Sequence, residues 1–291
     1  MKISGVMPIH NEEGYLPYSL ASLQESLIDE LVVVLDRCTD NSKKIIEKFS
    51  SYVSYSVKIV EVKKRKWFFP TAEVFKIGFE NAEGNVIYSL AADCIYNPEI
   101  FKIDWHNIDF ASFPYFAYDL YGNLIDKIHA NWINFYKIIL NVIYPKLTKK
   151  PKFSGIYAFK KTVYEVIPRY DMMSEDIWFL KEAWKKGFRY KYYPDLINLH
   201  LRPSTHQRQT KQAIHGISRA KLGYPFWKVL AHSILLWKPN TFKAYLRERG
   251  KTEKLRKFLK DLEDAYVDLQ VKSMKGWQIL KKTLRKRKCE K

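Results

Sequence analysis

The sequence predicts an α/β protein with a doubly wound, mainly parallel sheet, helices on both faces of that sheet, and a helical C-terminal extension. Short apolar runs typical of buried strands alternate with segments of helical spacing along the first half of the 291 residues. Polar clusters follow three of the predicted strands. Beyond residue 205 the chain becomes basic and aromatic, and the alternation stops.

Four strands and three helices are predicted in the first half of the chain. The strands cover residues 2–9, 31–35, 57–62 and 85–90, and the helices cover residues 11–26, 40–52 and 71–82. The run 31–35 is apolar and mostly β-branched, which is typical of a central parallel strand. Asp40 can cap the second helix, and Gly84 is a stop signal after the third.

The rest of the chain divides into a mixed region and a basic tail. Strands are predicted at residues 110–117, 153–159, 190–193 and 196–201, and helices at residues 124–144 and 174–186. Ser174 is the expected N-cap of the last helix and Gly187 its stop. After residue 205 a basic segment covers residues 207–222 and an apolar, aromatic segment covers residues 224–237. A basic helical tail follows at residues 239–291. We therefore expect one domain at residues 1–205 and a basic, aromatic helical extension at residues 206–291.

Composition limits the class of protein. The formal charge of +19 predicts an anionic partner, which is nucleic acid, an anionic membrane surface or a phosphate-bearing substrate. Three sparse cysteines, Cys38, Cys94 and Cys289, argue against a disulfide framework and fit a reducing compartment. No signal peptide is evident, and no apolar run reaches the roughly 18 residues of a membrane span. We expect a cytoplasmic protein.

Three polar clusters point to a binding site at one edge of the predicted sheet. They are Pro8–Glu12, Asp36–Asp40 and Asp93–Cys94, each at the end of a predicted strand. Ligands of doubly wound sheets bind outside the carboxyl ends of the strands. The convergence of three such ends carries more weight than any one acidic residue.

Individual residues have a functional and a structural interpretation. Asp93 could bind a hard cation together with phosphate oxygens, or cap the following turn. Asp36 could accept hydrogen bonds from a nucleoside, or stabilise its own turn. Glu175 and Asp176 could supply a general base, or complement the dipole of their helix. His200 could complete a metal site, or be a satisfied core histidine.

The order of these motifs resembles the family 2 glycosyltransferases, a family of GT-A fold. The resemblance covers about residues 3–203 and is carried by an opening Pro-x-x-Asn-Glu, a strand-end Asp cluster, a second strand-end Asp and a Glu-Asp helix. The matching segments are Pro8–Glu13, Val34–Ser42, Leu90–Asp93, Ser154–Gly155 with Lys160–Lys161, and Ser174–Asp176 with Gly187 and Tyr193–Pro194.

The resemblance implies an inverting glycosyltransferase that moves a sugar from a nucleotide-diphospho-sugar to a hydroxyl acceptor. It implies Mg²⁺ or Mn²⁺ as cofactor and a glycan, lipid-linked or protein-linked acceptor. The implied nucleotide-sugar-binding residues are Pro8, Glu12, Asp36 and Asp93, the implied metal residues are Asp93 and His200, and the implied catalytic base is Asp176.

The sequence departs from the family pattern at several positions. Ala91 replaces the first aspartate of the family's Asp-x-Asp, and Arg37-Cys38 replaces Gly-Ser. Residues 63–71 lack the glycine that usually precedes the following helix. The Gln-x-x-Arg-Trp signature of processive synthases is absent, so we do not expect polymer synthesis.

The aromatic and basic extension has two interpretations of its own. Residues 224–237 are too short to span a bilayer but could lie in its interface, with Trp132, Phe135 and Tyr136 adding to that surface. Basic residues of the tail would then attract anionic lipid, at about 1 kcal/mol each. The alternative is packing of the extension against the domain.

Two other functions compete with sugar transfer. A basic nucleic-acid-binding protein is favoured by charge alone, and because no recognised nucleic-acid module appears we expect no nucleic-acid partner. A non-catalytic sugar-nucleotide-binding module is favoured by Ala91 alone.

Overall fold

The computed structural model divides the chain into two compact units, Met1–Arg202 and Pro203–Lys291. It describes residues 1–67, 70–122, 124, 126–135, 138, 153–167, 175–202, 212–213, 216–217, 220, 226–235 and 238–249. The domain boundary expected near residue 205 lies outside these residues and stays a prediction.

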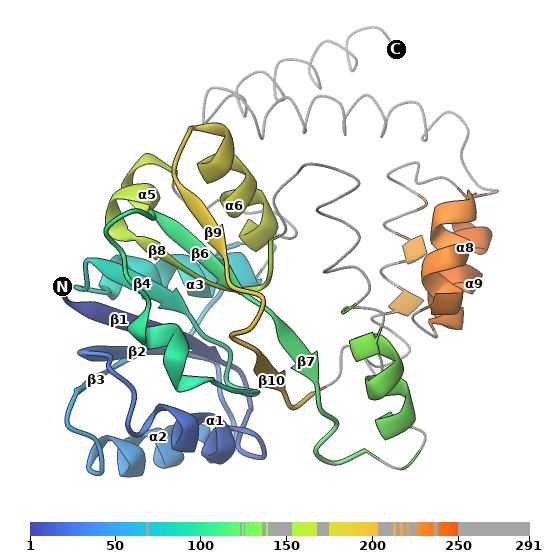
Figure 1. Cartoon of the computed structure of the whole chain (residues 1–291). Coiled ribbons are helices and arrows are strands. Elements are labelled where there is room, and N and C mark those ends of the chain that lie inside the picture. The colour runs from blue at the N-terminus through green and yellow to red at the C-terminus, as the bar shows by residue number, and fades with distance from the viewer. Residues whose placement is uncertain are drawn as a thin grey trace, which may run out of the picture. The chain divides into compact units, whose positions relative to one another are not determined.

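A seven-stranded sheet forms the centre of the first unit, in the order β3-β2-β1-β4-β8-β6-β9 (Figure 1). Its strands are β1 (Ile3–Ile9), β2 (Glu30–Asp36), β3 (Ser56–Val62), β4 (Val86–Ser89), β6 (Phe110–Phe113), β8 (Ile156–Lys160) and β9 (Tyr190–Tyr192). Only β8 runs antiparallel to its neighbours, β4 and β6. The predicted α/β class with a mainly parallel sheet is confirmed.

A second, three-stranded sheet lies beside the carboxyl ends of this sheet's strands. It has the order β5-β10-β7, with β5 (Cys94–Ile95), β10 (Asn198–His200) and β7 (Tyr115–Ala117). The strand predicted over residues 110–117 was therefore wrong as one element, because it divides at Pro114 into β6 and β7. Proline has no N–H for a ladder hydrogen bond. The Pro114 carbonyl instead accepts bonds from the Asn198 backbone (3.0 Å) and side chain (3.1 Å).

Helices cover both faces of the larger sheet. They are α1 (Leu16–Leu23), α2 (Ser42–Ser50), α3 (Pro70–Asn81), α5 (Lys161–Val166) and α6 (Glu175–Lys185). Leu20 and Ile46, from α1 and α2, share one core with Val33 of β2. On the other face, Phe79 of α3 makes an edge contact with Phe159 of β8. Phe159 in turn packs against Phe179 of α6.

Close packing between α3 and the sheet depends on Gly78. A methyl group at this position would overlap the side chain of Val6 and come within 3.1 Å of Val34. Because β-strand side chains alternate between faces, Val6 and Val34 belong to the face opposite Val33. The glycine lets α3 lie directly on β1 and β2 at this point.

The first turn of one helix differs from the expected bounds, and that of another agrees with them. The helix predicted from residue 11 begins at Leu16, because Asn11 has the left-handed φ of 56° that a right-handed helix excludes. α2 begins near Asp40 as expected, and the Asp40 carboxylate accepts a bond from the Ser42 N–H at 3.0 Å. The expected N-cap Ser174 lies outside the described residues.

Residues 126–135 form part of the helix predicted over 124–144, and the residues beyond 138 in that range lie outside the described part. In the second unit, α8 (Phe226–Leu235) and α9 (Pro239–Arg249) are helical as predicted. Val229 and Tyr245 form a small core there with Ala220. The tail beyond residue 249 is not among the described residues. Within the described part of the chain, every helix is too short or too polar to cross a bilayer.

Candidate active site

The Asp36 carboxylate, at the end of β2, is bound by two arginines and has a histidine nearby. Its side chain is only 5% exposed, and it accepts hydrogen bonds from Arg65 on both carboxylate oxygens and from Arg37 at 3.2 Å. The His10 imidazole Nδ1 lies 3.9 Å away. Burial by itself raises the pKa of Asp36, but the bonds from Arg65 and Arg37 outweigh it and hold that pKa below its ordinary value. Asp36 is therefore a carboxylate anchored at the sheet edge.

The turn after Asp36 explains the family's preference for glycine there. Arg37 has φ 52°, in the left-handed region where glycine carries no steric penalty. A non-glycine residue in this conformation costs about 1–2 kcal/mol. In exchange, the Arg37 side chain donates to Asp36. The departure noted in the sequence thus adds a cation next to the predicted nucleoside-binding carboxylate.

Glu12, after β1, forms an ion pair with Arg202, the last residue of the first unit. The Arg202 guanidinium forms an ion pair with Glu12, lies 3.8 Å from Asp93 and stacks on the Tyr15 ring at 4.7 Å. Burial raises the pKa of Glu12 and the nearby Asp93 charge adds to this, although Arg202 opposes both. One cation therefore bridges two of the three strand-end clusters.

Asp93 and His200 meet because β5 and β10 pair antiparallel. Their register places His200 opposite Cys94, and the His200 Nε2 lies 3.6 Å from an Asp93 carboxylate oxygen. One ligand atom each from Asp93, Cys94 and His200 fall within 4.8 Å of one another. Asp93 and His200 are partly exposed, whereas Cys94 belongs to the buried core. The predicted metal residues are thus brought together.

Asp176 is the second residue of α6 and is partly exposed. A methyl group built on Gly155 would lie 3.6 Å from its carboxylate, so the small residue of the Ser154–Gly155 segment borders it. Burial raises the pKa of Tyr115 to about 12, with the ionisable groups of Cys94, Asp176 and Asp93 adding to the shift. The Tyr115 ring, in β7, lies 5.4 Å from the His200 ring, and it borders Gly155 together with the Asp176 carboxylate.

Pro8 is accommodated near the end of β1. Its register partner in β2 is Val34, while the paired part of β4 ends at Ser89, opposite Val6. Because Pro8 and Val6 have the same parity, the missing Pro8 N–H would point past the end of β4. The proline therefore breaks no ladder hydrogen bond at the edge where the predicted site lies.

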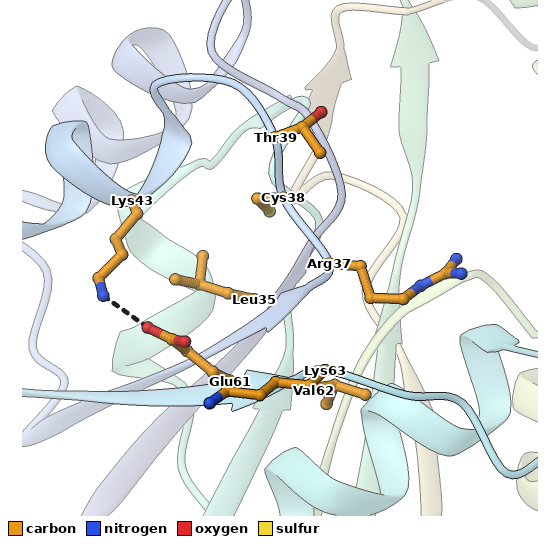
Figure 2. A pocket seen from close by; sticks show the side chains of 8 residues that line it. All are labelled: Leu35, Arg37, Cys38, Thr39, Lys43, Glu61, Val62 and Lys63. Atoms are coloured by element: carbon orange, nitrogen blue, oxygen red, sulfur yellow. Dashed lines mark hydrogen bonds and ion pairs between the residues drawn. The ribbon is translucent and has the colours of Figure 1, made fainter.

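A cavity of about 350 Å³ opens at the carboxyl ends of β2 and β3 (Figure 2). It is lined by Leu35, Arg37, Cys38, Thr39, Lys43, Glu61, Val62 and Lys63. Lys43 and Glu61 form an ion pair of 2.6 Å within it, and the Arg37 side chain points away from this pair. Asp36 does not line this cavity, but Arg37 both lines it and donates to the Asp36 carboxylate.

Sequence reasoning missed three residues of the site: Arg65, Arg202 and Tyr115. A weak signal existed for two of them. Arg202 follows His200 by two residues, the spacing that puts side chains on one face of an extended segment. Arg65 lies in the basic run 63–66 directly after β3.

Comparison with known proteins places this architecture. The chain is similar in fold to S. aureus TarS, with 18% identity and a TM-score of 0.51 over 76% of this chain and 40% of that one. It is also similar to M. tuberculosis glucosyl-3-phosphoglycerate synthase, with 17% identity and a TM-score of 0.52 over 77% of this chain and 80% of that one. The chain thus spans less than half the length of the TarS structure. No curated protein sequence matches it.

The architecture is a GT-A fold, like that of these two proteins. The profile described as glycosyl transferase family 2 matches residues 4–164. The chain belongs to this family, and the resemblance read from its motifs is confirmed.

Proposed function

We propose that this family 2 domain transfers a sugar from a nucleotide-diphospho-sugar to an acceptor hydroxyl with inversion at the anomeric carbon. The observation that carries the proposal is the meeting of Asp93 and His200 at the edge that also holds Asp36 and Glu12. These four residues come from four segments of the chain, and all were expected from chemistry at that edge.

The donor's nucleoside would lie near Pro8 and Asp36, with Glu12 at its border. Similar folds support such a donor, because one TarS structure is a complex with UDP and one synthase structure is a complex with Mn²⁺ and UDP-glucose. Arg65, Arg37 and Arg202 surround this edge with positive charge, which favours a diphosphate. Asp36 already binds Arg65 and Arg37, so a nucleoside would share that carboxylate with them.

The candidate metal ligands at the second sheet fit Mg²⁺ or Mn²⁺. These cations take carboxylate oxygens and, in nucleotide sites, are held by one or two carboxylates plus substrate phosphates. Asp93 and His200 would hold the ion, and Ala91 leaves Asp93 as the carboxylate of the family's pair. The ion would stabilise negative charge on the leaving diphosphate. Cys94 is buried in the core, so we assign it no ligand role.

Asp176 is the proposed general base. In a single displacement the acceptor oxygen attacks the anomeric carbon, the bond from that carbon to the diphosphate oxygen breaks, and the acceptor proton passes to a carboxylate. Asp176 borders Gly155 and shares Tyr115 as a neighbour with Asp93. This neighbourhood supports a base near the donor's diphosphate but separate from it.

The acceptor and the cellular location are proposals of wider scope. We propose a glycan, lipid-linked or protein-linked hydroxyl, a cytoplasmic location and peripheral binding to the inner membrane face. Family membership favours sugar transfer over nucleic-acid binding. The non-catalytic alternative keeps one supporting observation, which is alanine at position 91.

Titration of the full chain with UDP-, GDP- and dTDP-sugars, with Mn²⁺ and with EDTA, tests the proposal. We expect one nucleotide class to bind more tightly with Mn²⁺ and to be hydrolysed slowly without an acceptor. The anomeric configuration of a transfer product, read by NMR, tests inversion. Metal-dependent binding without any hydrolysis or transfer would favour the non-catalytic module, and no binding at all would contradict both.

A further inference from the structure

The helical residues 124, 126–135 and 138 carry an exposed apolar stripe. Its five members are between 41% and 74% exposed: Leu124, Ile128, Trp132, Phe135 and Ile138. Their spacing of four, four, three and three residues places them on one side of a helix. The Trp132 and Phe135 rings lie 6.1 Å apart. We call this set the apolar stripe.

The opposite side of this helix is buried, and Asn134 attaches the helix to β7. His129, Ala130 and Ile133 are buried. The Asn134 side chain accepts a bond from the Ala117 N–H and donates one to the Ala117 carbonyl, each at 2.8 Å. An amide that pairs with both backbone groups of one residue sets the rotation of the helix. The exposure of the apolar stripe therefore follows from how the helix is attached.

The same attachment places the helix next to the active site. Ala117, in β7, is the register partner of His200 in β10 (Figure 1). Just before the helix, Tyr121 donates to the Gly14 carbonyl at 2.6 Å and packs on Tyr15, the residue under Arg202. The helix that carries the apolar stripe thus contacts β7, and the residue just before it contacts the loop after β1.

The net charge of the sequence segment that carries the apolar stripe favours an anionic lipid surface as its occupant. Residues 121–152 contain one acidic residue, Asp126, and the lysines Lys127, Lys137, Lys146, Lys149, Lys150 and Lys152. A second copy paired face to face would bring these lysines together, at a cost in repulsion. Residues 203–291 contain more lysine and arginine than acidic residues, so their net charge has the same sign as that of the lysines. Apolar and aromatic residues flanked by lysine are the pattern of helices in membrane interfaces.

We propose that the apolar stripe inserts into an anionic lipid surface and so presents the active-site edge to an acceptor at that surface. This assigns the membrane contact to the first unit, not to the C-terminal tail. Presentation of the site to an acceptor rests on the proposed function, whereas lipid binding does not. Lipid binding is measured without donor or acceptor, so the two proposals can fail separately.

The test is flotation of the full chain with phosphatidylcholine vesicles that contain either no anionic lipid or about 30% phosphatidylglycerol. We expect binding to the anionic vesicles and a loss of at least about tenfold in Ile128→Glu/Phe135→Glu. The matched control is Leu27→Glu/Tyr52→Glu, which adds the same charge at two apolar residues that are 58% and 63% exposed outside the stripe. Ile128→Ser/Phe135→Ser repeats the test if the charged stripe variant misfolds by circular dichroism.

Three results would overturn the proposal. The first is no binding of the wild-type chain to anionic vesicles. The second is equal loss in the stripe and control variants, which would make the effect one of net charge. The third is a wild-type dimer, by light scattering, that the stripe variant converts to a monomer, since a second copy would then cover the stripe.

Discussion

Arg202 and Glu12 form an ion pair although 190 positions separate them in the chain. The pair joins the last residue of the first unit to the opening motif, and its guanidinium also lies 3.8 Å from Asp93. A cation at this distance lowers the affinity of Asp93 for a metal ion and raises the affinity of the site for a diphosphate.

Arg202→Ala is therefore expected to have opposite effects on two ligands. Mn²⁺ binding in the absence of nucleotide should tighten, and nucleoside diphosphate binding should weaken, each by about tenfold because one charged contact is removed. Calorimetry with each ligand alone measures both. Arg202→Lys keeps the charge but not the planar contact on Tyr15, and should lie between. A parallel loss of both affinities would show that Arg202 only maintains the fold.

Asp93→Asn and His200→Ala are expected to abolish the stimulation of donor binding by Mn²⁺. Each removes one of the two partly exposed donor groups, 3.6 Å apart, that would hold the ion. Cys94→Ser is the control, because its buried sulfur belongs to the core and should leave the metal dependence unchanged. Calorimetry of nucleotide binding over a Mn²⁺ series gives the comparison. Lost metal dependence in Cys94→Ser alone would point to a thiolate site of the zinc type.

Asp176→Asn is expected to lower turnover by about 10²- to 10⁴-fold, the usual loss when a general base is removed. Nucleotide affinity should stay within about twofold, because the diphosphate is assigned to Asp93 and the arginines and not to this residue. Steady-state kinetics and calorimetry separate the two effects. Glu175→Gln, in the same helical turn, tests the alternative of a helix-dipole acid. If both variants lose stability alike while turnover per folded molecule is kept, Asp176 is structural.

Asp36→Asn is expected to destabilise the protein by about 3 kcal/mol at pH 7, since it leaves two arginines without their buried partner. The pKa of Asp36 in the folded state is below its ordinary value of 3.8. Its stabilising effect is therefore present above that value and is lost as the pH falls through the folded-state pKa.

Urea unfolding at pH 7 and at pH values below 3.8 measures this effect. The wild-type and Asp36→Asn curves should converge in acid. Asp104→Asn is the control, because Asp104 is an exposed aspartate whose ion pair is with the exposed His106. A gap between wild type and Asp36→Asn that is constant with pH would mean that the carboxylate charge does not stabilise the fold.

Gly78→Ala is expected to cost about 1–3 kcal/mol, because the added methyl group meets Val6 where α3 lies on the sheet. Combining it with Val6→Ala should cost less than the sum of the two single changes, since the methyl would fill part of the space vacated. Thermal or urea unfolding of the cycle gives the coupling. Gly14→Ala, whose methyl would lie 3.8 Å from Tyr121, should be nearly neutral. Strict additivity at Gly78 would refute the close contact.

Local patterns in the sequence were enough for the fold class and for the candidate residues. Apolar runs such as 31–35, separated by helical spacing, predict parallel strands because side-chain periodicity is a property of neighbouring residues. Acidic residues at strand ends predict one edge site because parallel strands share their carboxyl edge. Asp36 and Asp93 were selected as candidates in this way.

Long-range pairing decided the rest. Nothing local in the sequence links Arg202 to Glu12 or Arg65 to Asp36, because these contacts form only when the sheet brings distant loops together. The division at Pro114 depends on Asn198 of the second sheet, whose side chain donates a hydrogen bond to the Pro114 carbonyl. Asn134 likewise sets the rotation of its helix through Ala117. The sequence by itself determined which groups are available at the edge, and the tertiary structure decided which cations neutralise them, since electrostatic pairing depends on distance in space.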